Sequence, residues 1–102
     1  MSTMSSQSNP FFQMPETACF SVQADADPGV LPRLLEVLAK RGLVPSRVHA
    51  TTLKPAEGGE KMTVDLQVGG VDADLQALMA ASMGQVFEVD RVLTARKSTL
   101  PV

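Results

Sequence analysis

The residues best placed to do chemistry stand in the run DPGVLP at positions 27–32. Proline is tolerated in the first turn of a helix, but deeper in the helix it removes a hydrogen bond and clashes with the preceding turn, at about 3 kcal/mol. Pro32 therefore predicts a helix that starts no earlier than about Gly29. Such a start leaves the backbone amides of Gly29, Val30 and Leu31 without intrahelical acceptors.

Free amides at the positive end of a helix suit a carboxylate. A glycine at the same place lets a ligand or a neighbouring backbone approach closely. The run therefore predicts a carboxylate-binding corner, and a plain Asp-Pro-Gly turn is the alternative.

The remaining reactive residue types form no catalytic or metal-binding pattern. His49 is the only histidine and has no second ligand at metal spacing, so we expect a surface or interface histidine, or a polar contact to a ligand at a seam between copies. Cys19 is the only cysteine and has no basic neighbour in the sequence, which favours a buried or edge thiol over a nucleophile. A single cysteine also excludes an intrachain disulfide and fits a reducing compartment. We predict no catalytic residue, no metal site and no cofactor.

Four strands must position these residues. Alternation of apolar and polar residues predicts strands over residues 17–24, 47–53, 61–68 and 86–95, with the third the most regular and the second the weakest. Their expected inward residues include Val48, Ala50 and Thr52 in the second strand. In the last strand the inward Phe87 and Val89 are out of phase with Val92, which predicts a bulge near Asp90.

Two helices complete the pattern. Apolar residues at helical spacing follow the 27–32 run, and Gly42 is placed for a left-handed cap at the end of that helix. Asp72 or a neighbour is expected to cap a second helix that ends at Gly84. Its predicted inner stripe is Leu75, Leu78, Met79 and Met83, with Asp74 and Gln76 facing water.

The βαββαβ order predicts an α+β domain of ferredoxin-like architecture, with a four-stranded antiparallel sheet covered on one face by two helices. Right-handed crossovers place the first and third strands in the centre and the second and fourth at the edges. We expect the domain to span residues 17–95, between a flexible arm at 1–16 and a tail at 96–102.

Length, charge and hydropathy exclude some classes of partner. The 102 residues allow one domain, and a net charge of -2 with a pI near 5.2 gives no positive field for nucleic acid. No apolar stretch approaches the roughly 20 residues that cross a bilayer, and no secretory signal is recognisable. We therefore expect a cytoplasmic protein with neither a nucleic-acid nor a membrane partner.

Three short motifs in this order resemble an ACT domain. They are the run at 27–31 after a strand, Arg-Gly-Leu at 41–43 where the first helix ends, and Phe-Glu-Val-Asp-Arg-Val at 87–92 in the last strand. They look most like the ACT domain of the small regulatory subunits of acetolactate synthase, an enzyme of branched-chain amino-acid biosynthesis. The resemblance covers residues 17–95.

The resemblance implies a non-catalytic regulatory role. ACT domains pair side by side through a sheet edge and bind amino acids such as valine at the interface. Ala26 and Val44 stand where valine-responsive small subunits usually have Asn, so we expect valine to bind poorly. The binding residues that the resemblance implies are Asp27, Gly29, Val30, Leu31 and Val44.

The implied partners are a second copy joined through a sheet edge, the large catalytic subunit of acetolactate synthase, and a small amino-acid ligand. Two alternatives remain open. One is a small enzyme of the ferredoxin-like or dimeric barrel class, with substrate on the concave sheet face, which a closed pocket of convergent polar groups would favour. The other is a purely structural dimerisation module.

Overall fold

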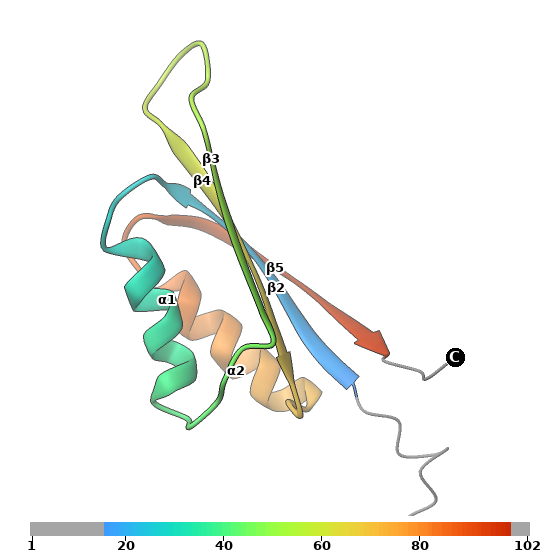
Figure 1. Ribbon diagram of the computed structural model, residues 1–102. Helices are drawn as coiled ribbons and strands as arrows, with labels where there is room; N and C mark the ends of the chain where they lie inside the picture. Colours follow the sequence, from blue (N-terminus) through green and yellow to red (C-terminus); the bar gives the residue numbers. More distant parts are fainter. Residues whose placement is uncertain (1–15, 99–102) are drawn as a thin grey trace, which may run out of the picture.

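The computed structural model describes residues 16–98, and the predicted order of strands and helices is confirmed (Figure 1). Residues 1–15 of the predicted arm and 99–102 of the predicted tail lie outside the described residues. The elements are β2 (Glu16–Asp25), α1 (Val30–Ala39), β3 (Arg47–Leu53), β4 (Lys61–Gly69), α2 (Ala73–Gly84) and β5 (Val89–Ser98).

The sheet has the predicted topology. Its strand order is β3-β4-β2-β5, and every neighbouring pair is antiparallel. The first and third strands therefore lie in the centre, as expected from right-handed crossovers. Both helices cover the same face of the sheet, and the other face is open (Figure 1).

The core lies between the two central strands and the helices. Alternation along β2 and β4 turns every second side chain toward the helices, where the aliphatic residues and Phe20 are buried. The helices contribute Leu34, Leu38, Met79 and Met83. None of the helices in the described part of the chain is long and apolar enough to cross a membrane.

The predicted helix caps are confirmed. Gly42 has a φ of 67°, and the amide of Leu43 donates to the carbonyl of Leu38 at 3.0 Å, which closes the end of α1. At the start of α2, the Asp72 carboxylate accepts a hydrogen bond from the amide of Leu75 at 2.8 Å.

The buried stripe of α2 differs from the predicted one. Gln76 is 5% exposed and joins Met79 and Met83 in the stripe, whereas Leu78 is 61% exposed. Gln76 can be buried because its amide is fully used: Nε2 donates to the carbonyls of Cys19 at 3.2 Å and Ala95 at 2.9 Å. The predicted placement of Gln76 in water and Leu78 in the core is therefore wrong.

The last strand starts and ends three residues later than predicted, at Val89 and Ser98. Residues 96–98 thus belong to the sheet, whereas the prediction assigned them to the tail. Phe87, predicted to point inward, precedes the strand in a turn and is 94% exposed. The predicted bulge is confirmed, because Ala24 pairs with Val89 while Gln23 pairs with Arg91, which leaves Asp90 as the extra residue.

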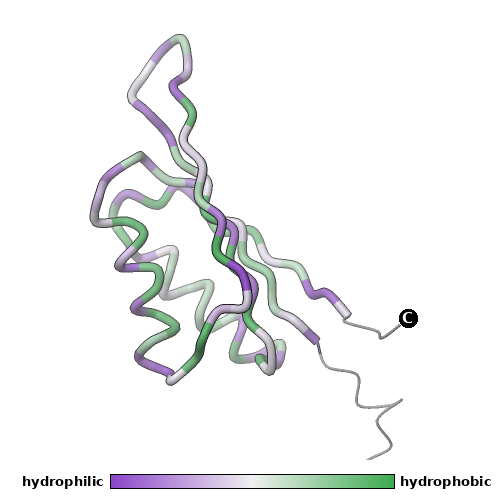
Figure 2. The backbone as a smooth tube through the Cα atoms, viewed as in Figure 1, coloured by the Kyte–Doolittle hydropathy of each residue, from purple (hydrophilic) through white to green (hydrophobic). Residues whose placement is uncertain are grey.

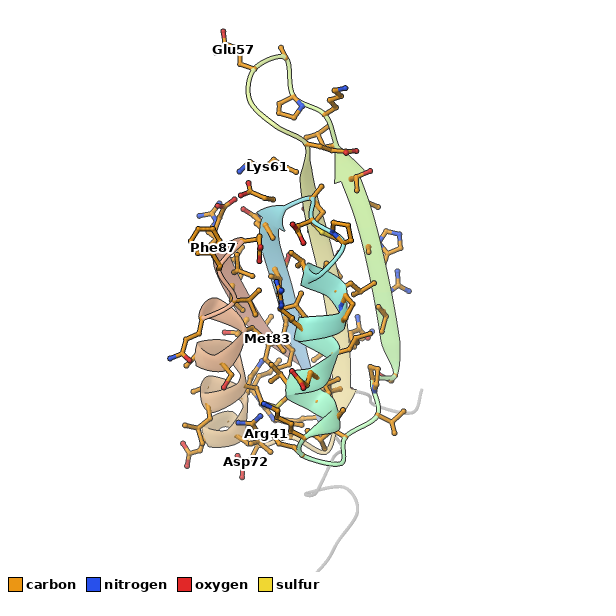
Figure 3. The ribbon with its side chains drawn as sticks, turned by 90° about the vertical axis from the view of Figure 1, so that its left-hand side faces the viewer. Arg41, Glu57, Lys61, Asp72, Met83 and Phe87 are labelled. Carbon is orange, nitrogen blue, oxygen red and sulfur yellow. The ribbon has the colours of Figure 1, made fainter. Side chains whose placement is uncertain are left out.

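Strand β3 has no buried face. All seven of its residues are exposed, including Val48, Ala50 and Thr52, which were predicted to point into the core. The reason is position: β3 is an edge strand with a neighbour on one side only, and α1 lies between α2 and β3 without covering β3 (Figure 3). The apolar residues of this strand are therefore exposed in the described part of the chain.

Candidate functional site

The predicted carboxylate-binding corner is largely closed by the chain itself. The Asp27 carboxylate accepts a hydrogen bond from the amide of Gly29 at 2.8 Å, and the Asp27 carbonyl accepts one from Val30 at 3.0 Å. This arrangement is an aspartate turn, in which the side chain caps backbone donors two residues on. The prediction that three free amides meet here is therefore wrong. Of the three predicted amides, only that of Leu31 has no acceptor among residues 16–98.

Helix α1 itself begins where Pro32 predicted. Val30 is its first residue and Gly29 precedes it as the N-cap. Proline thus stands in the first turn, where its missing amide costs no hydrogen bond.

An arginine lies over this corner. Arg33 Nη1 donates to Glu88 Oε1 at 3.2 Å, which ties α1 to the turn before β5. A Cβ atom at Gly29 would lie 3.1 Å from Arg33 Nη1 and 3.2 Å from Asp27 Oδ1, so a side chain at this position would displace the guanidinium by a few tenths of an ångström. Sequence reasoning missed Arg33 and Glu88, which are 55 residues apart and leave no local signal.

The structure does not bring all five predicted ligand residues together in one chain. Asp27, Gly29, Val30 and Leu31 lie at the start of α1, and the side chain of Val30 is fully buried. Val44 follows the other end of α1, which is 10 residues or about 15 Å long. Val44 is 82% exposed, so residues 16–98 do not enclose it in a site.

Strand β3 lies at an edge of the sheet, and its outer side pairs with no strand among residues 16–98. On its inner side β3 pairs with β4 in an unbroken register from Arg47 opposite Gln67 to Leu53 opposite Lys61. Arg47 is its only permanently charged residue, and it contains no proline. Val48 is 41% exposed and Leu53 69% exposed. An edge of this kind is a template for another strand.

A groove separates the two helices on the outside of the domain. Its volume is about 540 Å³, and one wall is formed by Arg33 and Glu36 of α1 and by Lys40, which follows the helix. The opposite wall comes from the end of α2 and the following turn, including Gln85 and Phe87. Figure 3 shows Phe87 on the outside of the domain at the upper end of α2 and Met83 between the helices.

The open face of the sheet is polar and shallow. A hollow of about 460 Å³ is lined by Cys19, Ser21, Arg47, Asp65 and Lys97, among others. It opens widely to solvent, unlike the closed pocket that would favour an enzyme. His49 stands directly opposite Asp65 on the neighbouring strand.

A charged cluster lies at the end of the sheet where β4 begins. Lys61 Nζ lies 2.6 Å from Asp25 Oδ1 and 3.2 Å from Asp90 Oδ2. Hydrogen bonds to these two carboxylates, first Asp25 and then Asp90, raise the pKa of Lys61 above its usual 10.5. The cluster links β4 to the central strand and to the bulge of β5. Within residues 16–98, no group of three or more His, Cys, Asp or Glu side chains could hold a metal ion.

The fold is that of known ACT domains. The ACT domain of GTP pyrophosphokinase from Chlorobium tepidum superposes with a TM-score of 0.62 at 15% sequence identity, over 78% of this chain and 96% of that one. The C-terminal domain of the MgtC protein from Mycobacterium tuberculosis also gives 0.62, at 10% identity over 85% and 93% of the two chains.

A third solved structure, of the quorum-quenching acylase GqqA, gives 0.58 at 16% identity over 84% of this chain and 43% of that one. No protein-family model matches the sequence, and no curated protein matches it. At these identities the comparisons establish the βαββαβ fold, which this chain shares with the ACT domain of GTP pyrophosphokinase.

Proposed function

We propose that this chain is a non-catalytic regulatory domain of the ACT type, which works as a side-by-side homodimer and responds to a small amino acid. The observation that carries the proposal is the free edge of β3, which has an unbroken register with β4, is charged only at Arg47 and is exposed at each of its residues. Three of the six large hydrophobic residues exposed among residues 16–98, namely Val44, Val48 and Leu53, lie on this strand or just before it. Pairing of two β3 strands would satisfy the free backbone groups and cover these side chains.

The register of such a pair follows from symmetry. Residues opposite one another in an antiparallel pair point to the same face of the sheet. The two-fold axis of a symmetric pair therefore lies midway between one residue and the same residue of the partner. Full overlap of Arg47–Leu53 puts Ala50 on the axis. Arg47 then lies opposite the partner's Leu53 and Val48 opposite the partner's Thr52, so that no like charges meet.

This pairing also accounts for the separated ligand residues. The Asp27 corner follows the end of β2, and Asp25 of that strand shares a row with Lys61 and Leu53. The corner is therefore at the Leu53 end of β3, and Val44 is at the Arg47 end. In an inverted partner the two ends exchange places, so the partner's corner comes to the exposed Val44.

The ligand of this composite site would be a small amino acid. Because the Gly29 amide already donates a hydrogen bond to the Asp27 carboxylate, the corner offers the ligand fewer free donors than an uncapped helix start. Its negative charge opposes a second carboxylate. We therefore expect weak binding, and poor binding of valine in particular.

The regulated enzyme that we propose is the large subunit of acetolactate synthase, on the motifs at 27–31, 41–43 and 87–92. The chain would act in the cytoplasm, where a free thiol such as Cys19 stays reduced. Co-purification with that large subunit, or a change in its activity on addition of the chain, tests this part. Failure of both would refute the choice of enzyme and leave the dimer untouched.

Sedimentation equilibrium and calorimetry with branched-chain and other amino acids test the rest. We expect a dimer whose titration with one amino acid gives heat, and loss of that heat in Val44→Asp. Lys97→Asp, an exposed charge change away from the seam, is the control and should leave the heat unchanged. A monomer at all concentrations would contradict the proposal, and a dimer that binds none of the amino acids would reduce it to a structural dimerisation module.

A further inference from the structure

The outer face of α2 is apolar, in contrast to that of α1. The outer side of α1 carries Arg33 and Glu36, and Lys40 follows at its end, whereas no charged residue occurs from Leu75 to Phe87. Figure 2 shows the same contrast, with hydrophilic colour recurring along α1 and mostly hydrophobic colour along α2 after its start. A surface helix normally keeps charges on its solvent side, and a helix that is apolar all round is normally covered.

The residues of this face are Ala77, Leu78 and Ala81. They lie opposite the buried Gln76, Met79 and Met83 at helical spacing, and all three are exposed. We name them the α2 patch. In the described part of the chain nothing covers it, because α2 packs on β5, β2 and α1 with its other sides.

The patch is too small for a stable interface with a second copy. A helix of 12 residues is about 18 Å long and about 10 Å wide, so one face offers roughly 200 Å². Stable interfaces between proteins bury about 800 Å² on each side. A tethered segment needs far less area, because its effective concentration is about millimolar.

The chain has such a segment next to the patch. Glu16 is bound to the residues that lead into α2: its carbonyl accepts from Gly70 at 3.3 Å, and Arg96 bridges the Glu16 carboxylate at 2.9 Å and the Val71 carbonyl at 2.6 Å. The segment 1–15 therefore joins the described domain near the start of α2. It carries no charged side chain and ends in Phe-Phe-Gln-Met-Pro.

We propose that residues 1–15 dock on the α2 patch, with Phe11 and Phe12 as the anchoring side chains. These residues precede Glu16 by five and four positions, so they can reach about 17 and 14 Å from it. That distance reaches Ala77, Leu78 and Ala81, which are one to two turns into α2. The match is one of apolar character on both sides, so docking removes no charge from water.

The two surfaces of the protein are then used separately. The α2 patch and the β3 edge lie on different sides of α1 (Figure 3), so docking of the segment does not depend on dimerisation. The proposal and the proposed regulatory function can therefore fail independently.

NMR of the full chain with labelled leucine methyl groups tests the docking. We expect nuclear Overhauser effects from the rings of Phe11 and Phe12 to the Leu78 methyls. These signals, and the Leu78 shifts, should change in the double variant Phe11→Ser/Phe12→Ser and in Ala77→Asp. The Leu93 methyls, on an exposed leucine of β5 that faces away from the helices, serve as the matched control and should not shift.

Three results would overturn the proposal. One is a Leu78 signal that is the same in wild type and in the double variant. Another is ring contacts to Leu93 or to α1 in place of Leu78. The third, in a mixture of labelled and unlabelled chains, is contact between Leu78 and a second copy through α2 itself. Unchanged shifts of the buried Leu66 methyls in each variant would show that the fold is intact.

Discussion

The two edges of the sheet are built in opposite ways. Strand β5 is interrupted by a bulge at Asp90 and carries Arg91, Arg96 and Lys97. Strand β3 is shorter, has an unbroken register and is charged only at Arg47. Bulges and charges are the usual means by which proteins keep edge strands from pairing, so β5 is a protected edge and β3 is not.

The two edge strands also differ in the side-chain hydrogen bonds that attach them to the rest of the domain. Arg96 of β5 donates to Gln76 at 2.8 Å, to the Val71 carbonyl and to Glu16, so the strand is tied to α2 and β2. No comparable network holds β3 within residues 16–98, and the strand has no buried residue. Within residues 16–98 the side-chain contacts that hold an edge strand are therefore concentrated on β5, and the outer edge of β3 is exposed.

The largest expected effect comes from a lysine on the proposed axis. In Ala50→Lys two like charges are introduced across the axis on side chains whose Cβ atoms stand about 5 Å apart, at a cost of about 3 kcal/mol at the effective dielectric of a protein surface. We expect the dimer Kd to rise roughly 100-fold, measured by sedimentation equilibrium. Ala95→Lys on β5 is the matched control and should leave the Kd unchanged. Equal weakening by both variants would remove the distinction between the edges.

A smaller effect is expected from the anchor of β5. Gln76→Ala removes two hydrogen bonds to the carbonyls of Cys19 and Ala95 and the acceptor of Arg96. We expect a loss of about 2 kcal/mol in the free energy of unfolding, measured by urea denaturation. Gln85→Ala, an exposed glutamine after the same helix, should stay within about 0.5 kcal/mol of wild type. No difference between the two variants would mean that the buried amide does not stabilise β5.

The rim of the proposed seam gives a third comparison. Leu53→Ala removes an exposed side chain that the dimer would partly bury, worth about 0.7 kcal/mol in each copy, so the Kd should rise about tenfold. Leu93→Ala makes the same change on β5. If the control weakened the dimer as much as Leu53→Ala does, the seam would lie at the other edge.

The smallest effect concerns the cluster around Lys61, which fastens the bulge of β5. Because its partners raise the folded pKa above 10.5, the contribution of Lys61 to stability is complete below pH 10.5 and is lost as pH rises through the folded pKa. We expect the stability difference between wild type and Lys61→Met to shrink above that pH, as followed by thermal denaturation in alkaline buffers. A difference that grows with pH would contradict this assignment.

Most of the fold is predictable because the central strands carry a clear signal. Alternation in β2 and β4 indicates which side chains are buried, and the phase change between Val89 and Val92 indicates the bulge at Asp90. The caps at Gly42 and Asp72 follow from residue type alone.

The errors have physical causes as well. Because α2 is apolar on most sides, its sequence gives little phase information, and the polar Gln76 was the residue that a pattern based on hydrophobicity excluded from the core. At the start of α1 the positions of the amide donors were right, but the acceptor was Asp27 itself. The Arg33–Glu88 contact joins distant parts of the chain, which no local pattern reveals.

Hydrogen exchange of the two edge strands at low and high protein concentration tests the central claim most directly. If β3 is the pairing edge, its outward amides between Arg47 and Leu53 will exchange more slowly as concentration rises. The outward amides of β5 will exchange at the same rate throughout. Exchange of β3 that does not depend on concentration, or slowing confined to β5, would contradict the claim.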